Sequence, residues 1–271
     1  MPYIKKTCYL PYRIEVEKTH SSRYGVPGIR YAPKEKPTPD EMKEINERNR
    51  IKKLYWVIAT NFDFGDYHTV LTYRKEDRPT PEKAKMTIKK FLRLLRKEFR
   101  NQGGELRYII TTEYRKSAIH HHLIINEIGT SAKIVRRLWK RGGAHFTPIY
   151  ENGEVEDLAA YLIKETQNSF RDPENPSKLS YSCSRNLRRP KIKTEIVKAG
   201  NWMEIPVAPK GYCIKKDSIV SGISRVTGYP YQYYTMYKCD KVKEEEGWIR
   251  PKKHGNKRKK RTDNKGGVPP D

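Results

Sequence analysis

Three consecutive histidines, His120-His121-His122, are the residues of this sequence best suited to chemistry. They lie in the run Ile119–Asn126, whose composition and alternation predict a β-strand. Side chains alternate between the two faces of a strand, so His120 and His122 share one face while His121 lies on the apolar face. We therefore expect His120 and His122 to bind one divalent metal ion, and His121 to pack in the core.

A carboxylate is suitably placed to be a third ligand. Glu113 ends the preceding predicted strand, Leu106–Glu113, which pairs with the histidine strand across a Tyr-Arg-Lys-Ser turn. Its oxygens are the hard donors that Mg²⁺ or Mn²⁺ prefers, and imidazole is tolerated beside them in a mixed site. A single strand histidine is usually a packing residue, but two on one face opposite a carboxylate favour a metal site. A purification tag is disfavoured because the histidines continue a strand-periodic segment.

A tyrosine and a lysine stand on a later predicted helix, Glu154–Gln167. At about 100° per residue, Tyr161 falls away from the apolar stripe of this helix, and Lys164 lies one turn further along the same flank. Tyrosine is common at the edge of a core, and a Tyr–Lys pair at this spacing often occurs by chance. The pair gains weight because it follows the histidine strand after one helix and one strand.

The elements that position these residues follow from hydrophobic periods and turn signals. The predicted strands are Leu54–Asn61, Tyr67–Arg74, Leu106–Glu113, Ile119–Asn126 and Ala144–Tyr150. Between them we expect one helix from Thr80 to Gly103, a short one over Ala132–Arg141 capped by Ser131, and finally Glu154–Gln167. The order β-β-α-β-β-α-β-α predicts an α+β fold, with a central antiparallel sheet of about five strands flanked by helices.

The chain ends differ from this central region. Residues 1–37 predict an irregular N-terminal arm with one short strand near Cys8–Val16, and Thr38 begins a surface helix to about Lys53 through a capping box with Glu41. Residues 178–238 predict short strands and turns. Within them, segment 206–238 either binds DNA or only covers the sheet, and the sequence leaves both open.

These boundaries predict four parts. They are an N-terminal arm and surface helix (1–53), a catalytic domain (54–200), a C-terminal extension that packs on or extends it (201–240), and a basic, disordered tail (241–271).

The charge of the chain indicates a polyanionic partner. Among 271 residues, 57 Lys and Arg face 32 acids, a formal charge of +25. Such an imbalance favours nucleic acid, because each neutralised phosphate releases counterions. The four cysteines are widely spaced, which predicts isolated thiols in a reducing compartment. No signal peptide or membrane span is apparent, so we expect a cytoplasmic protein without membrane contact.

The two motifs together resemble a known pattern. A His-hydrophobic-His strand followed by Tyr-x-x-Lys on a later helix is similar to the HUH endonuclease superfamily, and within it to rolling-circle replication initiators of phages and plasmids, of the gene II/replication-associated type. His120-His121-His122-Leu123-Ile124-Ile125 matches the histidine motif, although His121 takes its hydrophobic position. Tyr161-Leu162-Ile163-Lys164 matches the nucleophile motif, and Glu165 stands where two-tyrosine members carry a neighbour, which indicates a single-tyrosine enzyme. Weaker likenesses are Val70-Leu71-Thr72-Tyr73 and Ser184-Arg185-Asn186-Leu187, so the resemblance spans residues 54–190.

The resemblance implies a fold, a reaction and partners. The fold would be that of HUH endonucleases, and Tyr161 would attack a phosphodiester of single-stranded DNA at an origin, with Mg²⁺ or Mn²⁺ held by Glu113, His120 and His122. The product would be a 5′-phosphotyrosyl link and a free 3′-OH that primes a host DNA polymerase, with a helicase as further partner. Lys164 would orient the phosphate or offset charge. The setting would be the cytoplasm of a bacterial host, with the gene on a phage or plasmid.

Other functions compete with this one. The charge and the many tyrosines also suit a non-catalytic nucleic-acid-binding protein, because tyrosine stacks on bases. A relaxase or single-tyrosine transposase of the same superfamily is a second alternative. Relaxases usually place the tyrosine before the histidines, and single-tyrosine transposases are typically shorter. A hydrolase of small substrates is disfavoured by the charge.

Overall fold

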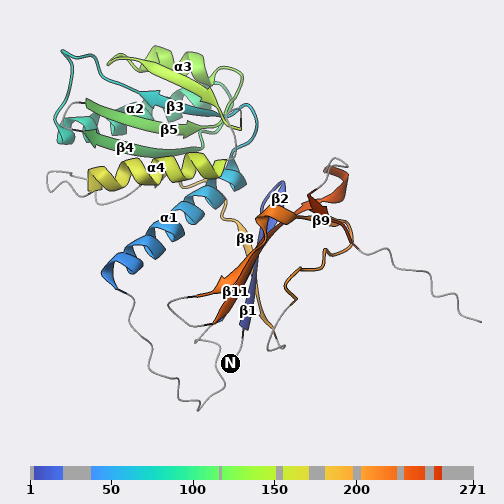
Figure 1. Ribbon diagram of the computed structural model, residues 1–271. Coiled ribbons are helices and arrows are strands. Elements are labelled where there is room, and N and C mark those ends of the chain that lie inside the picture. Colours follow the sequence, from blue (N-terminus) through green and yellow to red (C-terminus); the bar gives the residue numbers. More distant parts are fainter. Residues whose placement is uncertain are drawn as a thin grey trace, which may run out of the picture.

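The computed structural model describes residues 3–20, 38–115, 118–150, 155–170, 181–197, 203–224, 229–241 and 247–251. Two antiparallel sheets make up this part of the chain, and four α-helices flank the first of them (Figure 1). The helices are α1 (Pro39–Asn61), α2 (Pro81–Asn101), α3 (Ser131–Leu138) and α4 (Val155–Phe170). The predicted α+β class, with an antiparallel sheet between helices, is confirmed.

The first sheet has five strands in the order β6-β3-β5-β4-β7. They are β3 (Tyr67–Leu71), β4 (Tyr108–Arg115), β5 (Ala118–Ile125), β6 (Ala144–Pro148) and β7 (Ser182–Cys183). The histidine strand β5 is central and pairs with β4 on one side and β3 on the other. Glu113 is paired with His120, as the predicted hairpin requires.

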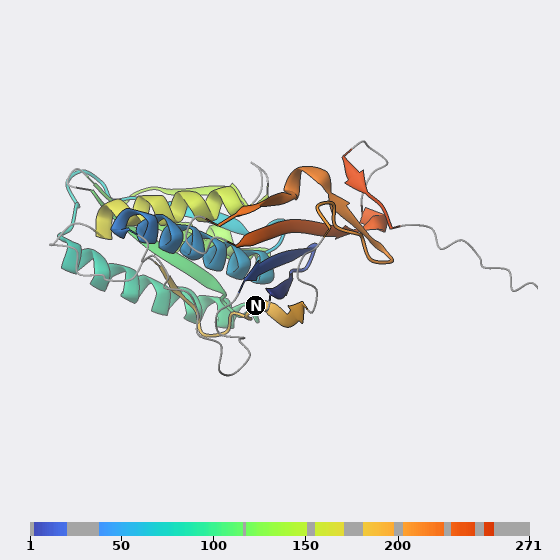
Figure 2. The same cartoon turned by 60° about the horizontal axis from the view of Figure 1, so that its bottom comes forward.

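Helices cover both faces of this sheet. On one face, α2 and α3 pack on Leu71, Leu123 and Ile125 in a cluster that also holds Phe99. On the opposite face, α1 and α4 pack on Ile109 and Ile124. Figure 2 shows α1 and α4 side by side, as their packing requires. The two faces of β5 therefore meet different helices, which separates His121 from its neighbours.

The predicted strand Leu54–Asn61 is wrong, because this segment is the C-terminal half of α1. Leu54, Tyr55, Ile58 and Ala59 are buried at helical spacing and pack with α4. The aromatic and β-branched residues of the segment favour a strand locally, but burial against α4 and the sheet outweighs that preference. The helix begins as predicted: the side chain of Thr38 accepts from the Glu41 amide, and the carboxylate of Glu41 accepts from the Thr38 amide at 2.9 Å.

The first sheet therefore contains four of the five predicted strands, and its fifth strand is β7, which pairs with β4 and not with β3 as the predicted 54–61 hairpin would. The order from α1 to α4 is α-β-α-β-β-α-β-α. The predicted boundary between residues 53 and 54 falls inside α1. Residues 171–176, whose two prolines and polar composition predict a loop after the tyrosine helix, lie outside the described residues.

The expected irregular N-terminal arm is also wrong over residues 3–20. This segment forms a hairpin of β1 (Tyr3–Tyr9) and β2 (Arg13–His20). Its strands are central in a seven-stranded sheet, because β8 pairs with β1 and β11 pairs with β2. The partner strands of this hairpin, β8 and β11, begin near residues 190 and 230. Local periodicity cannot reveal pairing between strands so far apart in the sequence.

The remaining strands of the second sheet come from the C-terminal third. They are β8 (Lys191–Val197), β9 (Tyr212–Lys215), β10 (Val220–Ile223), β11 (Pro230–Lys238) and β12 (Trp248–Ile249). This agrees with the predicted short strands and turns, because segment 206–238 supplies β9, β10 and β11 to the second sheet, which it shares with β1, β2, β8 and β12. Trp248–Ile249 pairs with β9 inside the predicted tail, whose basic block 257–261 lies outside the described residues.

Two cysteines correct a further expectation. Cys213 and Cys239 form a disulfide, with their Cα atoms 5.3 Å apart. They lie at the paired ends of β9 and β11, where antiparallel pairing brings residues 26 apart in sequence together. Cys8 is a buried thiol and Cys183 an exposed one. The prediction of four isolated thiols is therefore wrong for one pair.

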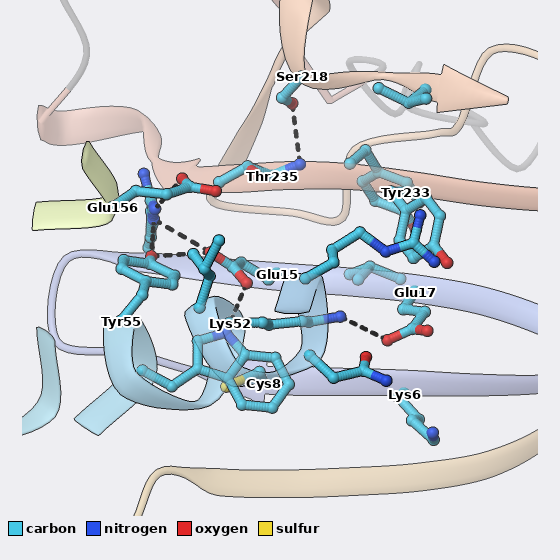
Figure 3. A pocket seen from close by; sticks show the side chains of 18 of the residues that line it. Lys6, Cys8, Glu15, Glu17, Lys52, Tyr55, Glu156, Ser218, Tyr233 and Thr235 are labelled. Atoms are coloured by element: carbon cyan, nitrogen blue, oxygen red, sulfur yellow. Dashed lines mark hydrogen bonds and ion pairs between the residues drawn. The ribbon is translucent and has the colours of Figure 1, made fainter. Parts of the chain in front are cut away.

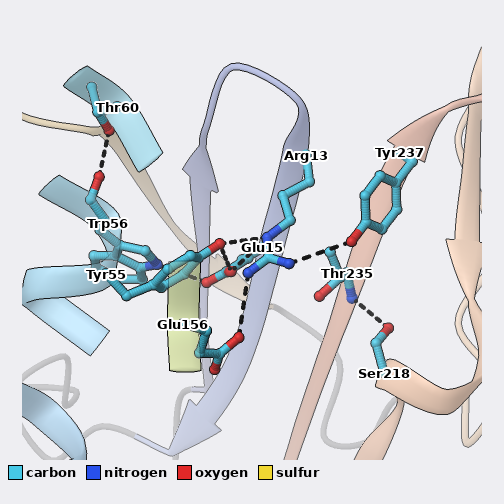
Figure 4. A network of polar contacts seen from close by, with 9 residues as sticks. All are labelled: Arg13, Glu15, Tyr55, Trp56, Thr60, Glu156, Ser218, Thr235 and Tyr237. Carbon is cyan, nitrogen blue, oxygen red and sulfur yellow. Dashed lines mark hydrogen bonds and ion pairs between the residues drawn. The ribbon is translucent and has the colours of Figure 1, made fainter. Parts of the chain in front are cut away.

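A polar network joins the second sheet to the helices (Figure 4). Arg13 of β2 donates to the Tyr55 hydroxyl on α1, to the Tyr237 hydroxyl on β11 at 3.4 Å and to the Glu156 carboxylate on α4 at 3.3 Å. Tyr55 in turn donates to Glu15 at 2.8 Å. A cation of the second sheet thus contacts both helices that cover one face of the first.

Candidate active site

His121 lies on the face of β5 covered by α2 and α3, and it is fully buried. Its two ring nitrogens lie 2.9 Å from the Tyr73 hydroxyl and 2.8 Å from Thr112 Oγ1. Burial, with smaller contributions from the neighbouring histidines, lowers the pKa of His121 to about 3. A neutral ring held in this way is a packing residue, in line with the strand alternation.

His122 points to the opposite face and is 3% exposed. Its Nε2 lies 3.4 Å from Oε2 of Glu113, which is equally buried. His120 stands opposite Glu113 in the ladder and on the same face as His122, and it is partly exposed. The structure thus brings the Glu113 and His122 side chains together and places His120 at the neighbouring position.

His68 on β3 is the residue that the sequence reasoning missed. Its ring stacks on that of His122 with centroids 5.5 Å apart, and Nε2 of His68 lies 3.3 Å from Nδ1 of His122. Burial lowers the pKa of His68 to about 4, which keeps the ring neutral near pH 7. The two nitrogens of His122 therefore face different partners, Glu113 and His68, and this fixes the direction of its Nε2. Alternation alone places His68 with Val70, but only the β3–β5 register places it beside His122.

Tyr161 reaches this site from α4. The apolar residues of that helix, Val155, Ala159, Leu162 and Ile163, are buried against α1 and the sheet. Tyr161 is 44% exposed, and its ring meets the His122 ring edge to face with centroids 5.5 Å apart. Lys164, one turn on, is exposed. The predicted tyrosine and one predicted histidine are therefore in ring contact, although 39 positions separate them in the sequence.

The donors around His122 suit a hard divalent cation. A carboxylate and imidazoles are the ligand types for Mg²⁺ or Mn²⁺ in a mixed site. Among the described residues, however, no three His, Cys, Asp or Glu side chains already converge in a metal-binding arrangement. Glu113 and His122 fit two positions of such a site, and His120 lies opposite Glu113 in the ladder, on the same face of β5.

The weaker motifs have structural roles. Tyr73, at the end of the stretch that follows β3, supports His121, as given above. Ser184 is buried and its hydroxyl accepts from the Tyr108 amide at 3.1 Å, while Asn186 donates to the Leu106 carbonyl. These contacts hold the segment after β7 against β4. The segment then leads to β8 of the second sheet, so it supports the site without lining it.

One family model matches the segment that builds the candidate site. Residues 66–170 match the family model for replication-associated protein ORF2/G2P. The matched span runs from the start of β3 to the end of α4 and contains His68, Glu113, His122 and Tyr161. The similarity to ORF2/G2P replication-associated proteins thus covers the segment that builds the candidate site, while the second sheet lies outside it. No curated protein and no solved structure matches the chain. Within the described residues, no helix is long and apolar enough to cross a membrane.

Proposed function

We propose that this protein initiates rolling-circle replication by nicking single-stranded DNA at an origin, with Tyr161 as nucleophile and a divalent metal ion as helper. The observation that carries the proposal is the ring contact between Tyr161 and His122, whose Nε2 faces the buried Glu113. The match to replication-associated proteins over residues 66–170 supports a role in replication initiation. The formal charge of +25 supports binding to a polyanion.

The reaction is a transesterification. The Tyr161 oxygen attacks the phosphorus, the bond from phosphorus to the 3′-oxygen breaks, and the departing oxygen takes up a proton equivalent to the one that the phenol loses. A 5′-phosphotyrosyl link and a free 3′-OH result, and the retained bond energy allows later rejoining. The free 3′-OH would prime a host polymerase behind a host helicase, in the cytoplasm of a bacterium that carries the phage or plasmid.

The residues of the candidate site would have separate roles in this reaction. Glu113, His120 and His122 would hold Mg²⁺ or Mn²⁺, which when bound stabilises negative charge on the scissile phosphate. His68 would hold His122 in the ligating orientation. Lys164, exposed on the same helix as Tyr161, would attract or orient the phosphate. Partial burial of the Tyr161 ring against His122 would fix the direction of its attack.

The test is capture of the covalent adduct. The full chain would be incubated with a library of labelled single strands and Mn²⁺ or Mg²⁺, and the DNA-linked peptide identified by mass spectrometry. Tyr161→Phe should still bind the strand but form no adduct. Tyr9→Phe is the matched control, because Tyr9 lies on the second sheet and is 40% exposed against 44% for Tyr161. An adduct on Tyr161→Phe would exclude this residue as nucleophile, and absence of any adduct on the parent would favour a non-catalytic binding protein.

A further inference from the structure

A second feature that could contact DNA is an aromatic pocket where the first sheet, α1 and the second sheet meet. It has a volume of about 380 Å³, within the range of small-molecule sites. Its walls include the rings of Tyr12, Tyr55, Phe64, Tyr150 and Tyr237. These residues come from the β1–β2 turn, α1, the α1–β3 turn, the end of β6 and β11.

Two of these rings form a stacked platform. Phe64 and Tyr150 lie with centroids 4.7 Å apart and planes at 28°. Tyr12 meets Phe64 edge to face at 6.2 Å. Phe64 is 69% exposed, an unusual placement for a large apolar ring at a turn. The stack leaves no room for a further ring between its members, so a flat ligand would pack on the pocket-facing side.

Hydrogen bonds and one strained backbone position hold the platform in place. The Tyr12 hydroxyl donates to both oxygens of Asp63, at 2.6 and 2.7 Å, and the Asp63 amide donates to Asp66 at 2.9 Å. Tyr150 has a φ of 70°, in the left-handed region that a bulky residue rarely adopts. Such backbone strain persists where surrounding structure enforces it, and it is concentrated at ligand sites.

The pocket is close to the candidate nucleophile. Val155 lines it and is the first residue of α4, on which Tyr161 stands six residues further along. At 1.5 Å per residue, this is about 9 Å along the helix axis. Six residues turn a helix by about 240°, so Val155 and Tyr161 lie on different flanks of α4. A strand whose phosphate reaches Tyr161 would therefore pass around the helix and place a base a few nucleotides away in the pocket.

We propose that this pocket binds one unpaired nucleobase of the DNA strand, within a few nucleotides of the one that Tyr161 attacks. The inference rests on the proposed function for the position of the strand. Flat aromatic walls favour a base, because stacking on tyrosine and phenylalanine is available to every base and adds to the electrostatic attraction of a basic protein. A paired base cannot enter, so the pocket selects single strands over duplex.

A larger groove nearby, of about 960 Å³, fits this role less well. It lies between α1 and the second sheet (Figure 3), and Arg13, Tyr55 and Tyr237 line both this groove and the aromatic pocket. Carboxylates and cations line it together, and its Lys52 is paired with Glu17 at 2.6 Å. Carboxylates along a path for phosphates repel the strand, whereas among the residues that line the aromatic pocket Arg13 is the one ionisable group with a permanent charge.

The experiment compares strands with and without bases. Binding of the full chain, in EDTA and at fixed salt, would be measured by fluorescence anisotropy for a short oligothymidine strand and for an abasic strand of the same length. The double variant Phe64→Ala with Tyr150→Gly should lose roughly ten-fold in affinity for oligothymidine. Its affinity for the abasic strand should not change, because the phosphate contacts are intact.

Controls separate stacking from folding. Tyr150→Gly suits a positive φ, and Phe64→Leu, which keeps apolar bulk without a flat π face, should lose most of the same preference for bases. Ile223→Ala on β10 is the matched surface control, since Ile223 is 70% exposed and lies outside the pocket. Parental preference for bases in Phe64→Leu and in the double variant would overturn the proposal, as would an equal loss with the abasic strand.

The outcomes also separate this proposal from the proposed function. Adduct formation is scored on the parent, and the preference for bases is scored by comparing the parent with the pocket variants. If the parent forms no adduct but the double variant loses its preference for bases, the pocket stands as a base-binding site and the nicking function fails. If the adduct forms and the preference is unchanged, nicking stands and the base pocket fails.

Discussion

The two sheets of this protein differ in how far apart in the sequence their strands lie. Strands β3 to β6 of the first sheet come from residues 67–148, and they are held between helices from the same part of the chain or next to it. The second sheet joins a hairpin at residues 3–20 to strands between residues 191 and 249. The candidate chemistry lies on the first sheet and on α4, where Tyr161 meets His122 of the central strand β5. The second sheet contributes Tyr12 and Tyr237 to the wall of the aromatic pocket and a polar connection through Arg13, so damage to the two sheets should have different consequences.

The largest expected effect is loss of cleavage from damage to the first sheet's site. Under the proposed function, His122→Ala together with His120→Ala should reduce nicking by a factor on the order of a thousand or more, and EDTA should do the same to the parent. Gel assays of a labelled single strand would measure it. His145→Ala on β6 is a control, because His145 also lies on the first sheet. Cleavage that persists in EDTA would rule out the metal.

His68→Ala should have a smaller effect on the same reaction. The ring of His68 orients His122 without being one of the proposed ligands. Loss of such an orienting partner typically costs 10- to 100-fold in metal affinity or activity. The expected signature is a higher Mn²⁺ concentration for half-maximal nicking. A variant with an unchanged Mn²⁺ requirement would show that His68 only fills space.

Truncation of a core residue in the first sheet's layers should reduce stability more than any surface change. Leu95 on α2 is fully buried, and Leu95→Ala should lower the free energy of unfolding by about 2–5 kcal/mol. Met236→Ala in the smaller cluster of the second sheet should fall at the lower end of that range, because few neighbours enclose it. Urea unfolding followed by circular dichroism gives both numbers. A larger loss for Met236→Ala would reverse the ranking of the two sheets.

Arg13→Met tests the connection between the sheets. Methionine keeps the apolar stem but removes the donors to Tyr55, Tyr237 and Glu156. We expect a loss of about 1–3 kcal/mol, with oligonucleotide nicking retained. Lys238→Met, an exposed change on β11, should be neutral within about 0.5 kcal/mol. If nicking fell as far as in the histidine variants, the connection would control the site and not merely the fold.

The smallest effect concerns the start of α1. Thr38→Ala removes the acceptor for the Glu41 amide and should cost about 1 kcal/mol in unfolding free energy. Glu44→Ala, further along the exposed part of the helix, is the comparison. Equal effects of the two substitutions would mean that the cap adds nothing beyond helix propensity.

The local sequence pattern was sufficient to predict much of the first sheet. The alternation of Ile119–Asn126 separates His121 from His122 correctly, and the hairpin register pairs Glu113 with His120. It failed at Leu54–Asn61, because a helix and a buried strand of that length share the same apolar residues, and the packing partner α4 decides between them. His68 could not be assigned to the site because its position depends on which strand lies beside β5. The β1–β2 hairpin and the Cys213–Cys239 pair were missed for the same reason, since distant pairing leaves no local signature.

The central position of β1 and β2 in the second sheet has a consequence for how the protein is made. Roughly 200 residues separate β2 from its neighbour β11. At about 5–20 residues per second, the ribosome needs roughly 10–40 seconds to supply that partner after the hairpin emerges. During this time the residues between the two can be synthesised and folded. The outer edges of β1 and β2 meanwhile lack their partner strands. The order of synthesis therefore makes β1 and β2 available well before the strands that enclose them.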